Sequence, residues 1–531
     1  MSVSDWLRMV GPVGMTWALG HATGFGNSTD IVMVAFCLVM TCLILMVERV
    51  GGRWAWFTSG GKPVSVGSLE KWASRHPRLT WLGYGHHWGG QAARKLHEYL
   101  IRRPLEEGPL DLRRFIKHSR RLAPGITLGN MLVMGAPGTG KTLMFTWLAH
   151  QAIARGHGVV FIDPKGGRRV RSALKKSARK CGRPYFQLLP AEPQDSHCID
   201  LLANAQQGSE LASRIARLLP ADEKDNAFGQ FAWMVLNRII TALRCVGIPV
   251  TLRTVRWHVM DQGKALVEQM EHGSGHETLY RELQELAKHD ALHYRKMILT
   301  LIPLLDTLTA GALGDLLSPV RSGSFRVNPA QVVAQGGVLY AGLGSLSDIS
   351  VSRALGSLLL ADLAAIAGNR YRSTRHEPAL RVFVDEAAEM VNDAFIQLLN
   401  KGRECGVEVT FAVQTVADLE LAMGNEAAAR MMVGNAASLV AFRTLDPGSQ
   451  QLFSERMGPV QVQMESHQSG AQNLVSGKGT HWGKTAGVSQ QWVEVPLMPE
   501  PVLARLPDRH YVALLGGHSV LAGMLPPLVF S

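Results

Sequence analysis

The chain has 531 residues with a formal net charge of +12, and 46 % of its residues are hydrophobic. Its length predicts more than one domain and a large buried core. The basic surplus indicates a polyanionic partner or an anionic membrane surface, and it carries no information on the fold. None of the six cysteines forms a CxxC pair, which excludes the usual zinc and redox motifs, and we expect no disulfides.

An uncharged apolar segment, Ile31–Val47, lies near the N-terminus. At about 1.5 Å per residue it is long enough for a helix across a membrane, and aromatic residues follow it as at an interface. No basic region closely precedes it, which disfavours a cleaved signal peptide; the alternative is a buried core helix. Met9–Gly26 is a weaker second candidate that would form a hairpin with it. Because lysines and arginines follow the segment, we expect the remainder of the chain in the cytoplasm.

Residues 51–122 form a juxtamembrane region in this prediction. Tyr84–Gly90 is rich in glycine and is predicted to be a loop. Its His86 and His87 have no further metal ligands flanking them, so a plain loop is favoured over a metal site. The basic segment Arg113–Arg121 is predicted to lie against anionic lipid or DNA, or to be an ordinary solvated helix face.

The next segment, Gly135–Thr142, reads GAPGTGKT and lies between an apolar run, Met131–Met134, and helix-forming residues, Leu143–His150. Strand, glycine loop and helix in this order predict a P-loop. Its glycines let backbone N–H groups point at phosphate oxygens, Lys141 adds a positive charge, and the Thr142 hydroxyl is placed to bind Mg²⁺. We expect the following residues to bind the nucleotide: Gly135, Ala136, Pro137, Gly138, Thr139, Gly140, Lys141 and Thr142.

A short apolar strand, Gly158–Ile162, follows the P-loop helix, and this βαβ order predicts a parallel sheet. The helix predicted over Arg168–Lys180 carries seven cations beside one narrow apolar stripe. It indicates either a polyanion or lipid partner, or a solvated surface helix. From about 204 to 317 the apolar periodicity is helical, which predicts an all-α insertion.

Strands return after residue 317. Glu465–Ser489 is rich in Ser, Gly and Gln and poor in apolar residues, so we expect a long loop there. The last two predicted strands are expected to form a hairpin that turns at Gly516 and Gly517. The predicted strands are Gly337–Leu343, Leu380–Val384, Val407–Val413, Ser438–Phe442, His510–Leu515 and Ser519–Leu525.

The strand at 380–384 ends in two carboxylates, Asp385 and Glu386. Beside a P-loop this indicates a Walker B strand, in which Asp385 holds Mg²⁺ opposite Thr142 and Glu386 polarises the attacking water. Gln414 ends the next strand. Since ligands bind at the carboxyl ends of parallel strands, we expect Gln414 to face the γ-phosphate, or else to be a turn residue.

Arginines on nearby loops are candidates for a finger that reaches a neighbouring subunit's nucleotide. Arg403 is the first choice, with a surface salt bridge to Glu404 or Glu408 as the alternative, and Arg443 is the second. No Asn-Lys-x-Asp pattern follows the P-loop, so the sequence favours ATP over GTP.

Together with the apolar N-terminal segment and the helical insertion, five motifs resemble the TraD/TraG-type coupling proteins of bacterial conjugation. These motifs are GAPGTGKT, FIDPKG, FVDEAAEM, NKGRECGVEVTFAVQTVADLE and VGNAASLVAFR. The resemblance runs from about residue 120 to the end and is most specific in Gly402–Leu419. No long acidic tail follows Pro527, so we expect no docking of relaxosome proteins through such a tail.

The resemblance implies an inner-membrane ATPase that assembles as a homohexamer, receives a relaxase-bound single DNA strand and feeds it to a type IV secretion channel. It implies that Lys141, Thr142, Asp385 and Glu386 form the ATPase core, with Gln414 and Arg403 as coupling residues, and that the all-α insertion meets the relaxosome. DNA binding is expected to be salt-sensitive and independent of sequence.

We therefore predict an α/β fold: a RecA-like P-loop NTPase domain with a central, mostly parallel sheet, an all-α insertion domain and an N-terminal transmembrane segment. The expected parts are residues 1–50 for the membrane segment, 51–122 for the juxtamembrane region, 123–203 with 318–531 for the motor, and 204–317 for the insertion. Three alternatives stay open: a coupling ATPase for protein effectors, a nucleotide-binding membrane receptor that does not hydrolyse, and a chromosome translocase of the FtsK kind.

Overall fold

The computed structural model describes residues 63–102, 108–116, 120–125, 128–219, 227–270, 276–318, 326–373, 377–476 and 479–530. Residues Pro63–Ser531 form one compact unit. The predicted membrane segment at 31–47 and its weaker neighbour at 9–26 lie outside the described residues.

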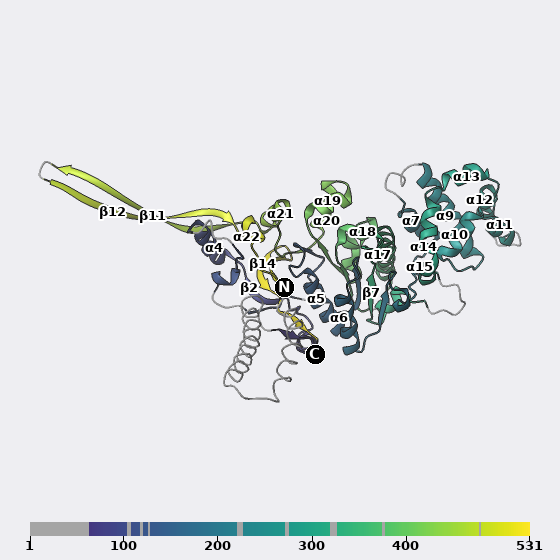
Figure 1. Cartoon of the computed structure of the whole chain (residues 1–531), viewed down its shortest axis with the longest axis horizontal. Helices are drawn as coiled ribbons and strands as arrows, with labels where there is room; N and C mark the ends of the chain where they lie inside the picture. The colour runs from purple at the N-terminus through teal and green to yellow at the C-terminus, as the bar shows by residue number, and fades with distance from the viewer. Residues whose placement is uncertain are drawn as a thin grey trace, which may run out of the picture. The chain divides into compact units, whose positions relative to one another are not determined.

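The main element is an eleven-stranded sheet with the strand order β3-β2-β14-β13-β10-β4-β9-β8-β5-β7-β6 (Figure 1). The strands from β10 to β6 are parallel to one another, which confirms the mostly parallel sheet. β13, β14, β2 and β3 continue it as an antiparallel extension. The strands are β2 (Gly83–His87), β3 (Arg120–Leu122), β4 (Met131–Met134), β5 (Gly158–Asp163), β6 (Tyr185–Leu188), β7 (Val338–Gly342), β8 (Leu380–Val384), β9 (Val407–Val413), β10 (Ser438–Ala441), β13 (His510–Leu515) and β14 (Ser519–Met524).

All the strands predicted from apolar runs are present, because strands covered on both faces need apolar side chains throughout. Every residue of β4 and β5 is buried. Since β4, β9, β8 and β5 are parallel neighbours, their carboxyl ends lie along one edge of the sheet. A short parallel pair, β1 (Val64–Ser65) and β15 (Leu528–Val529), lies apart from the main sheet.

The prediction of a loop at Tyr84–Gly90 is wrong, because β2 (Gly83–His87) is a strand within the main sheet. Glycine is present there to allow close approach of two backbones, and not to make a turn. A Cβ atom built on Gly85 would lie 2.1 Å from the carbonyl oxygen of Ala522 in β14. Both β2 and β3 come from the 51–122 region, so this part of the chain contributes directly to the sheet.

Helices cover both faces of the sheet. Leu132 and Met134 of β4 belong to one buried cluster, and Met131 and Val133 to the other, because successive side chains of a strand point to opposite faces. The second cluster includes residues of α3 (Val66–Arg75), α5 (Lys141–Ala154) and α6 (Arg168–Lys180). The first includes residues of α4 (Gly90–Arg102), α16 (Pro329–Ala334), α17 (Ile349–Arg372), α18 (Asp393–Lys401), α19 (Val416–Met423), α20 (Glu426–Gly434), α21 (Pro447–Met457) and α22 (Glu500–Ala504).

Two of these helices bear on the sequence predictions. α6 has the predicted bounds and buries its apolar stripe at Val170, Leu174 and Ala178. α17 is the one helix in the described part of the chain that is long and apolar enough to cross a membrane, but 61 % of its apolar window is buried inside the protein. This burial is typical of a core helix.

The segment from 204 to 317 is helical in its described residues, as predicted. A buried ion pair joins it to α17: the Arg214 guanidinium lies 2.9 Å from an Asp362 carboxylate oxygen, and the amide of Asn204 donates to the same carboxylate. Burial raises the pKa of Asp362 to about 6. The helices are α7 (Gly208–Ala216), α9 (Ala227–Cys245), α10 (Leu252–Met260), α11 (Lys264–Met270), α12 (Glu277–Ala287), α13 (Ala291–Met297), α14 (Leu301–Thr309) and α15 (Gly311–Leu317).

The loop predicted at Glu465–Ser489 is also wrong. β11 (Pro459–Ser476) and β12 (Gly479–Pro496) pair as an antiparallel ribbon from Pro459 opposite Pro496 to Ser476 opposite Gly479 (Figure 1). The prediction relied on the low apolar content of the segment. Main-chain hydrogen bonds between two strands do not depend on apolar side chains, so this signal does not exclude a ribbon.

Candidate nucleotide-binding site

The glycine loop between β4 and α5 has the backbone that its spacing predicts. Gly135, Gly138 and Gly140 have positive φ angles of 156°, 78° and 123°, which L-residues with a Cβ atom rarely adopt. A Cβ on Gly135 would also lie 2.7 Å from the Cβ of Phe442, and one on Gly140 would lie 3.3 Å from the Cα of Arg509. Glycine is therefore needed both for the turn and for close packing.

Backbone contacts from two distant segments hold this loop in place. The Ala136 N–H donates to the carbonyl oxygen of Arg443 at 2.8 Å, and the Arg509 N–H donates to that of Thr139 at 2.8 Å. Within the loop, the Thr139 hydroxyl donates to the Ala136 carbonyl oxygen at 2.7 Å. Pro137 lies between these contacts. Contacts within the protein thus brace the loop.

Lys141 and Thr142 begin helix α5. The Lys141 ammonium is buried and donates to the carbonyl oxygens of Gly135 and Ala136. Burial lowers the pKa of this lysine, while the nearby carboxylates of Asp385 and Glu386 oppose the shift. The helix has no side-chain cap at Gly140 and no acidic residue in its first turn, so its N-terminus is suited to an anion.

Asp385 follows β8 and faces Thr142, as predicted. The Thr142 hydroxyl donates to Asp385 Oδ2 at 3.1 Å. Burial, together with the negative charges of Asp163 and Glu386, raises the pKa of Asp385. A hydroxyl and a carboxylate in contact, with further carboxylates crowded around them, fit Mg²⁺, since a divalent cation would relieve this repulsion.

Glu386 has an unusual backbone and three side-chain neighbours. Its φ and ψ angles are 47° and 52°, in the left-handed region, and such outliers often occur at functional sites. Its Oε1 atom accepts a hydrogen bond from the Gln414 amide at 3.3 Å and forms an ion pair with the Lys165 ammonium. Burial raises the pKa of Glu389, and the negative charge of Glu386 raises it further. Gln414, directly after the neighbouring strand β9, therefore lies beside Glu386.

Lys165 is a residue that the sequence reasoning missed as a site residue. It lies in the FIDPKG motif, for which the sequence predicted no role in the site. Asp163 orders this turn, because its carboxylate accepts from the N–H groups of Lys165, Gly166 and Gly167, and from the Tyr340 hydroxyl at 2.9 Å. The Asp-Pro-Lys-Gly sequence is the signal that could have been used, since it places a lysine at the same sheet edge as the P-loop.

The two candidate arginines lie in different places. Arg403 is exposed on a short 3₁₀ helix, Gly402–Cys405, that precedes β9. Arg403 therefore lies before the amino end of β9 and Gln414 after its carboxyl end. The two are about 20 Å apart along this strand of seven residues. Within the described residues Arg403 forms no ion pair, and Glu408 pairs with Arg381 instead. Arg443 lies at the glycine loop and pairs with Asp508 at 2.8 Å.

A cavity of about 780 Å³ opens beside Glu386 and Gln414. Its wall includes residues of the helical segment and of α17, so it connects the carboxylate edge of the sheet to both. Among the residues that line it are Arg217, Arg353, Glu389 and Asn392.

A braced glycine loop, a buried lysine and carboxylates at the carboxyl ends of a mostly parallel sheet have the geometry of a P-loop nucleotide-binding fold. Residues 379–508, which include β8, β9 and Gln414, match the family model described as the TraM recognition site of TraD and TraG. The resemblance to the TraD/TraG-type coupling proteins is thus confirmed. No curated protein matches the sequence.

Solved structures of the coupling protein TrwB have the same fold. The trigonal form of the bacterial conjugative coupling protein TrwBdeltaN70 with sulphate has a TM-score of 0.54 and 18 % identity, covering 85 % of this chain and 94 % of that one. TrwB with the ATP analogue ADPNP has a TM-score of 0.53 and 17 % identity, covering 86 % and 96 %. TrwB with ADP and Mg²⁺ has a TM-score of 0.51 and 18 % identity, covering 76 % and 86 %.

Proposed function

We propose that the chain is an ATP-hydrolysing coupling protein of conjugative DNA transfer. The observation that supports this most directly is the set of side chains at the carboxyl ends of β4, β8 and β9. Lys141 and Thr142 follow the first of these strands, Asp385 and Glu386 the second, and Gln414 the third. Phosphoryl transfer needs this combination of a phosphate cradle, a cation site and a group that orients water.

In this proposal, ATP lies with its triphosphate in the glycine loop. Lys141 exchanges the two carbonyl oxygens that it now contacts for oxygens of the β and γ phosphates. Mg²⁺ held through Thr142 and Asp385 would neutralise charge on the phosphates. Glu386 accepts a hydrogen bond, and then the proton, from the attacking water. Gln414 contacts Glu386 and responds to the γ-phosphate, so that hydrolysis alters the start of α19 next to it.

The active form is proposed to be a homohexamer. Arg403 lies at the edge of the sheet away from its own glycine loop and is exposed, which suits a residue that acts on a neighbouring subunit's nucleotide. Arg443 is the second candidate for this arginine finger, because its guanidinium already forms an ion pair with Asp508. In this proposal the motor consists of residues 123–203 and 318–531 together with β2 and β3 of the 51–122 region, which extend its sheet, and the all-α insertion is at 204–317.

We further propose that the protein works at the bacterial inner membrane, anchored by the apolar N-terminal segment, with its motor in the cytoplasm. It would pass a relaxase-bound DNA strand to a type IV secretion channel, gripping phosphates without regard to sequence. The matching family model is described as the TraM recognition site of TraD and TraG. We therefore propose that residues 379–508 contact the relaxosome.

The test is ATP turnover by the full-length protein in neutral detergent, with and without single- or double-stranded DNA, at low and moderate salt. We expect turnover that rises with DNA, falls with salt, and is lost in Lys141→Ala and Glu386→Gln. Lys296→Gln, which removes an exposed cation of α13, is the matched control and should behave as the wild type. Turnover that ignores DNA would favour a protein cargo. If Glu386→Gln bound ATP and still supported transfer, the chain would be a receptor that does not hydrolyse.

A further inference from the structure

Helix α6, which packs beside α5 (Figure 1), carries a face of cations that the candidate nucleotide site does not use. Of its thirteen residues, seven are Arg or Lys and none is Asp or Glu. The apolar stripe of the helix faces the core, so the cations occupy the opposite side. Six of them are exposed and are called the α6 cations below: Arg168, Arg169, Lys175, Lys176, Arg179 and Lys180.

Few carboxylates lie near these cations. Glu192 pairs at 2.8 Å with Arg171, the seventh cation of the helix, and its pKa is lowered by Arg171 and then by Arg168. Within the described residues, none of the α6 cations forms an ion pair. The two other helices on this face of the sheet, α3 and α5, contain one acid, Glu70, which is half-buried. The surface is therefore strongly positive and attracts a polyanion.

Like charges follow one another along the outer side of α6. Arg171, Lys175 and Arg179 are spaced four residues apart, and so are Lys176 and Lys180. Cations at this spacing are neighbours on a helix surface and destabilise the helix. Since the buried stripe needs none of these charges, the helix would be more stable with fewer of them.

The first turn of α6 has the same property. It begins after the N-cap residue Gly167 with Arg168 and Arg169, and it has no acidic residue. The positive end of the helix dipole disfavours cations at this position. Residues that lower the stability of their own element are expected where they serve a function, so we looked for the anion that would relieve them.

The composition of this face favours a duplex over a single strand. Proteins that bind single strands stack the bases on exposed aromatic side chains. Helix α6 has no Phe, Tyr or Trp, and those of α3 and α5 are Trp72, Phe145 and Trp147, which are at most 8 % exposed. Binding to the outside of a duplex needs only cations that reach its phosphates.

An anionic membrane fits this face less well. A helix that lies in a membrane surface inserts an apolar side into the lipid. The apolar stripe of α6 is instead buried in the protein, where Val170, Leu174 and Ala178 belong to the core cluster on this face of the sheet. The exposed side of the helix thus offers charge alone.

The density of charge also matches a duplex. At about 1.5 Å per residue, α6 is about 20 Å long. A DNA duplex carries one negative charge per about 1.7 Å of its axis, so about twelve phosphates lie along that length and about six of them face one side. The six α6 cations are sufficient to pair with them.

The start of α6 is joined to the candidate nucleotide site. The N–H of its N-cap residue Gly167 donates to the Asp163 carboxylate at 2.8 Å, and the same carboxylate accepts from the N–H of Lys165. The Lys165 ammonium in turn pairs with Glu386. A ligand along α6 therefore contacts an element whose first turn is fixed to the turn that carries Lys165.

We propose that the α6 cations bind the phosphate backbone of double-stranded DNA without reading its sequence. The choice of DNA as the polyanion rests on the proposed function. The site adds a duplex contact to the single strand that is proposed to pass to the secretion channel. Through the turn at Lys165, a duplex bound to α6 also raises ATP turnover.

The test measures binding of a fluorescent duplex of about 20 base pairs to the full-length protein in neutral detergent, without nucleotide and at several salt concentrations. Lys175→Gln with Lys176→Gln and Arg179→Gln, the α6 variant, removes three α6 cations. We expect it to bind at least tenfold more weakly. The slope of log K against log salt should fall by about 2–3, since each phosphate contact contributes about 0.9.

A control variant removes the same net charge elsewhere. Lys288→Gln with Arg295→Gln and Lys296→Gln replaces three exposed cations of the helical segment, and it should change duplex affinity less than twofold. Equal losses in the two variants would mean that net charge alone governs binding, which would overturn the assignment to α6.

Thermal unfolding separates lost binding from lost folding. Because like charges are removed, the Tm of the α6 variant should equal or exceed that of the wild type, and a lower Tm would refute the argument from repulsion. Lys176→Gln alone should lower the salt slope by about 1 with an unchanged Tm.

Other outcomes would also overturn the assignment. Equal duplex affinity of the α6 variant and the wild type would show that the duplex binds elsewhere. A single strand of the same length that competes as tightly as the duplex would assign the face to single-stranded DNA. Phosphatidylglycerol vesicles whose binding falls tenfold in the α6 variant, while duplex binding stays the same, would assign it to the membrane.

This result can be told apart from that for the proposed function. Turnover that rises with DNA in the α6 variant as much as in the wild type would support a DNA motor without this site. Duplex binding that depends on α6, in a protein whose ATP turnover does not need Lys141, would support this site without the proposed ATPase.

Discussion

Lys165 offers a sharp test of the candidate site, because sequence reasoning had no role for it. Its ammonium forms an ion pair with Glu386 Oε1, the same oxygen that the Gln414 amide contacts. The Lys165 side chain is 50 % exposed and that of Glu386 is 15 % exposed. We expect Lys165 to act as a positioning residue that orients the Glu386 carboxylate, and Lys165→Ala to slow turnover.

The size of the effect follows from the contact. A hydrogen bond to a charged group contributes about 1.5–3 kcal/mol, and the exposure of Lys165 reduces this to about 1–2 kcal/mol. Since each 1.36 kcal/mol is a factor of ten in rate, kcat should fall about 5- to 30-fold. The KM for ATP should change little, because the glycine loop and Lys141 hold the phosphates.

Steady-state ATP turnover of the full-length protein gives both constants. Lys165→Arg keeps the charge and should recover most of kcat, while Lys296→Ala, at an exposed residue of α13, is the matched control. An unchanged or increased kcat in Lys165→Ala would refute the positioning role, and a rise in KM without a fall in kcat would mean that Lys165 binds substrate instead.

Three further predictions concern the free energy of unfolding, measured on the full-length protein in neutral detergent. At pH 8, Asp362→Asn removes one of the two carboxylates that pair with the buried Arg214 and leaves its ion pair with Glu210, so we expect a loss of about 1.5–3 kcal/mol. Asp362→Leu with Arg214→Leu should recover most of it, and a double variant no more stable than the single would contradict this. Burial lowers the pKa of His150 to about 4, below its unfolded value of about 6.5. The unfolded state therefore binds the proton more readily, and the stability from this group is complete above pH 6.5 and lost towards pH 4, by up to about 3 kcal/mol. His150→Gln should flatten that dependence, and an unaltered slope would count against it. Gly85→Ala would put a Cβ atom 2.1 Å from the Ala522 carbonyl oxygen, so we expect a loss of about 1–3 kcal/mol; Gly89→Ala, with nothing within 4 Å, is the control, and equal losses would remove the steric explanation.

The sequence alone was sufficient for the strands of the parallel sheet and for the glycine loop. Strands such as β8 and β9 have the bounds that their apolar runs predict, because burial on both faces leaves a signal in consecutive residues. The order of strand, glycine loop and helix is also local, since the loop conformation depends on glycines at fixed spacing. The Thr142–Asp385 contact could be anticipated because both residues follow parallel strands of one sheet.

Composition was misleading where main-chain pairing decides the structure. β2 is rich in glycine and was predicted to be a loop, but its glycines allow close contact with β14. The ribbon of β11 and β12 is polar and was also predicted to be a loop. In both places backbone hydrogen bonds to another strand define the element, β14 for β2 and the adjacent β12 for β11, and side-chain hydrophobicity does not report them.

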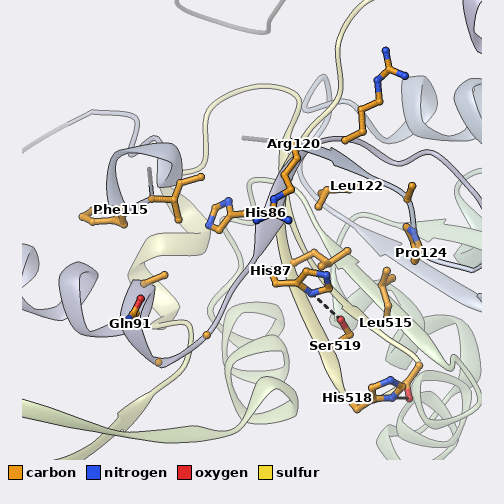
Figure 2. Close-up of a pocket in the computed structure, with 18 of the residues that line it drawn as sticks. His86, His87, Gln91, Phe115, Arg120, Leu122, Pro124, Leu515, His518 and Ser519 are labelled. Carbon is orange, nitrogen blue, oxygen red and sulfur yellow. Dashed lines mark hydrogen bonds between the residues drawn. The ribbon is translucent and has the colours of Figure 1, made fainter. Parts of the chain in front are cut away.

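Only the tertiary structure determined which residues from distant positions share a site. Lys165 and Glu386 are 221 positions apart, and the braces of the glycine loop come from Arg443 and Arg509. A cavity of about 1060 Å³ that is lined by Lys95, Arg120 and His518 likewise joins three separate segments (Figure 2). Local sequence patterns specify strands and turns, because those depend on neighbouring residues, whereas side-chain partners depend on how the whole sheet is ordered.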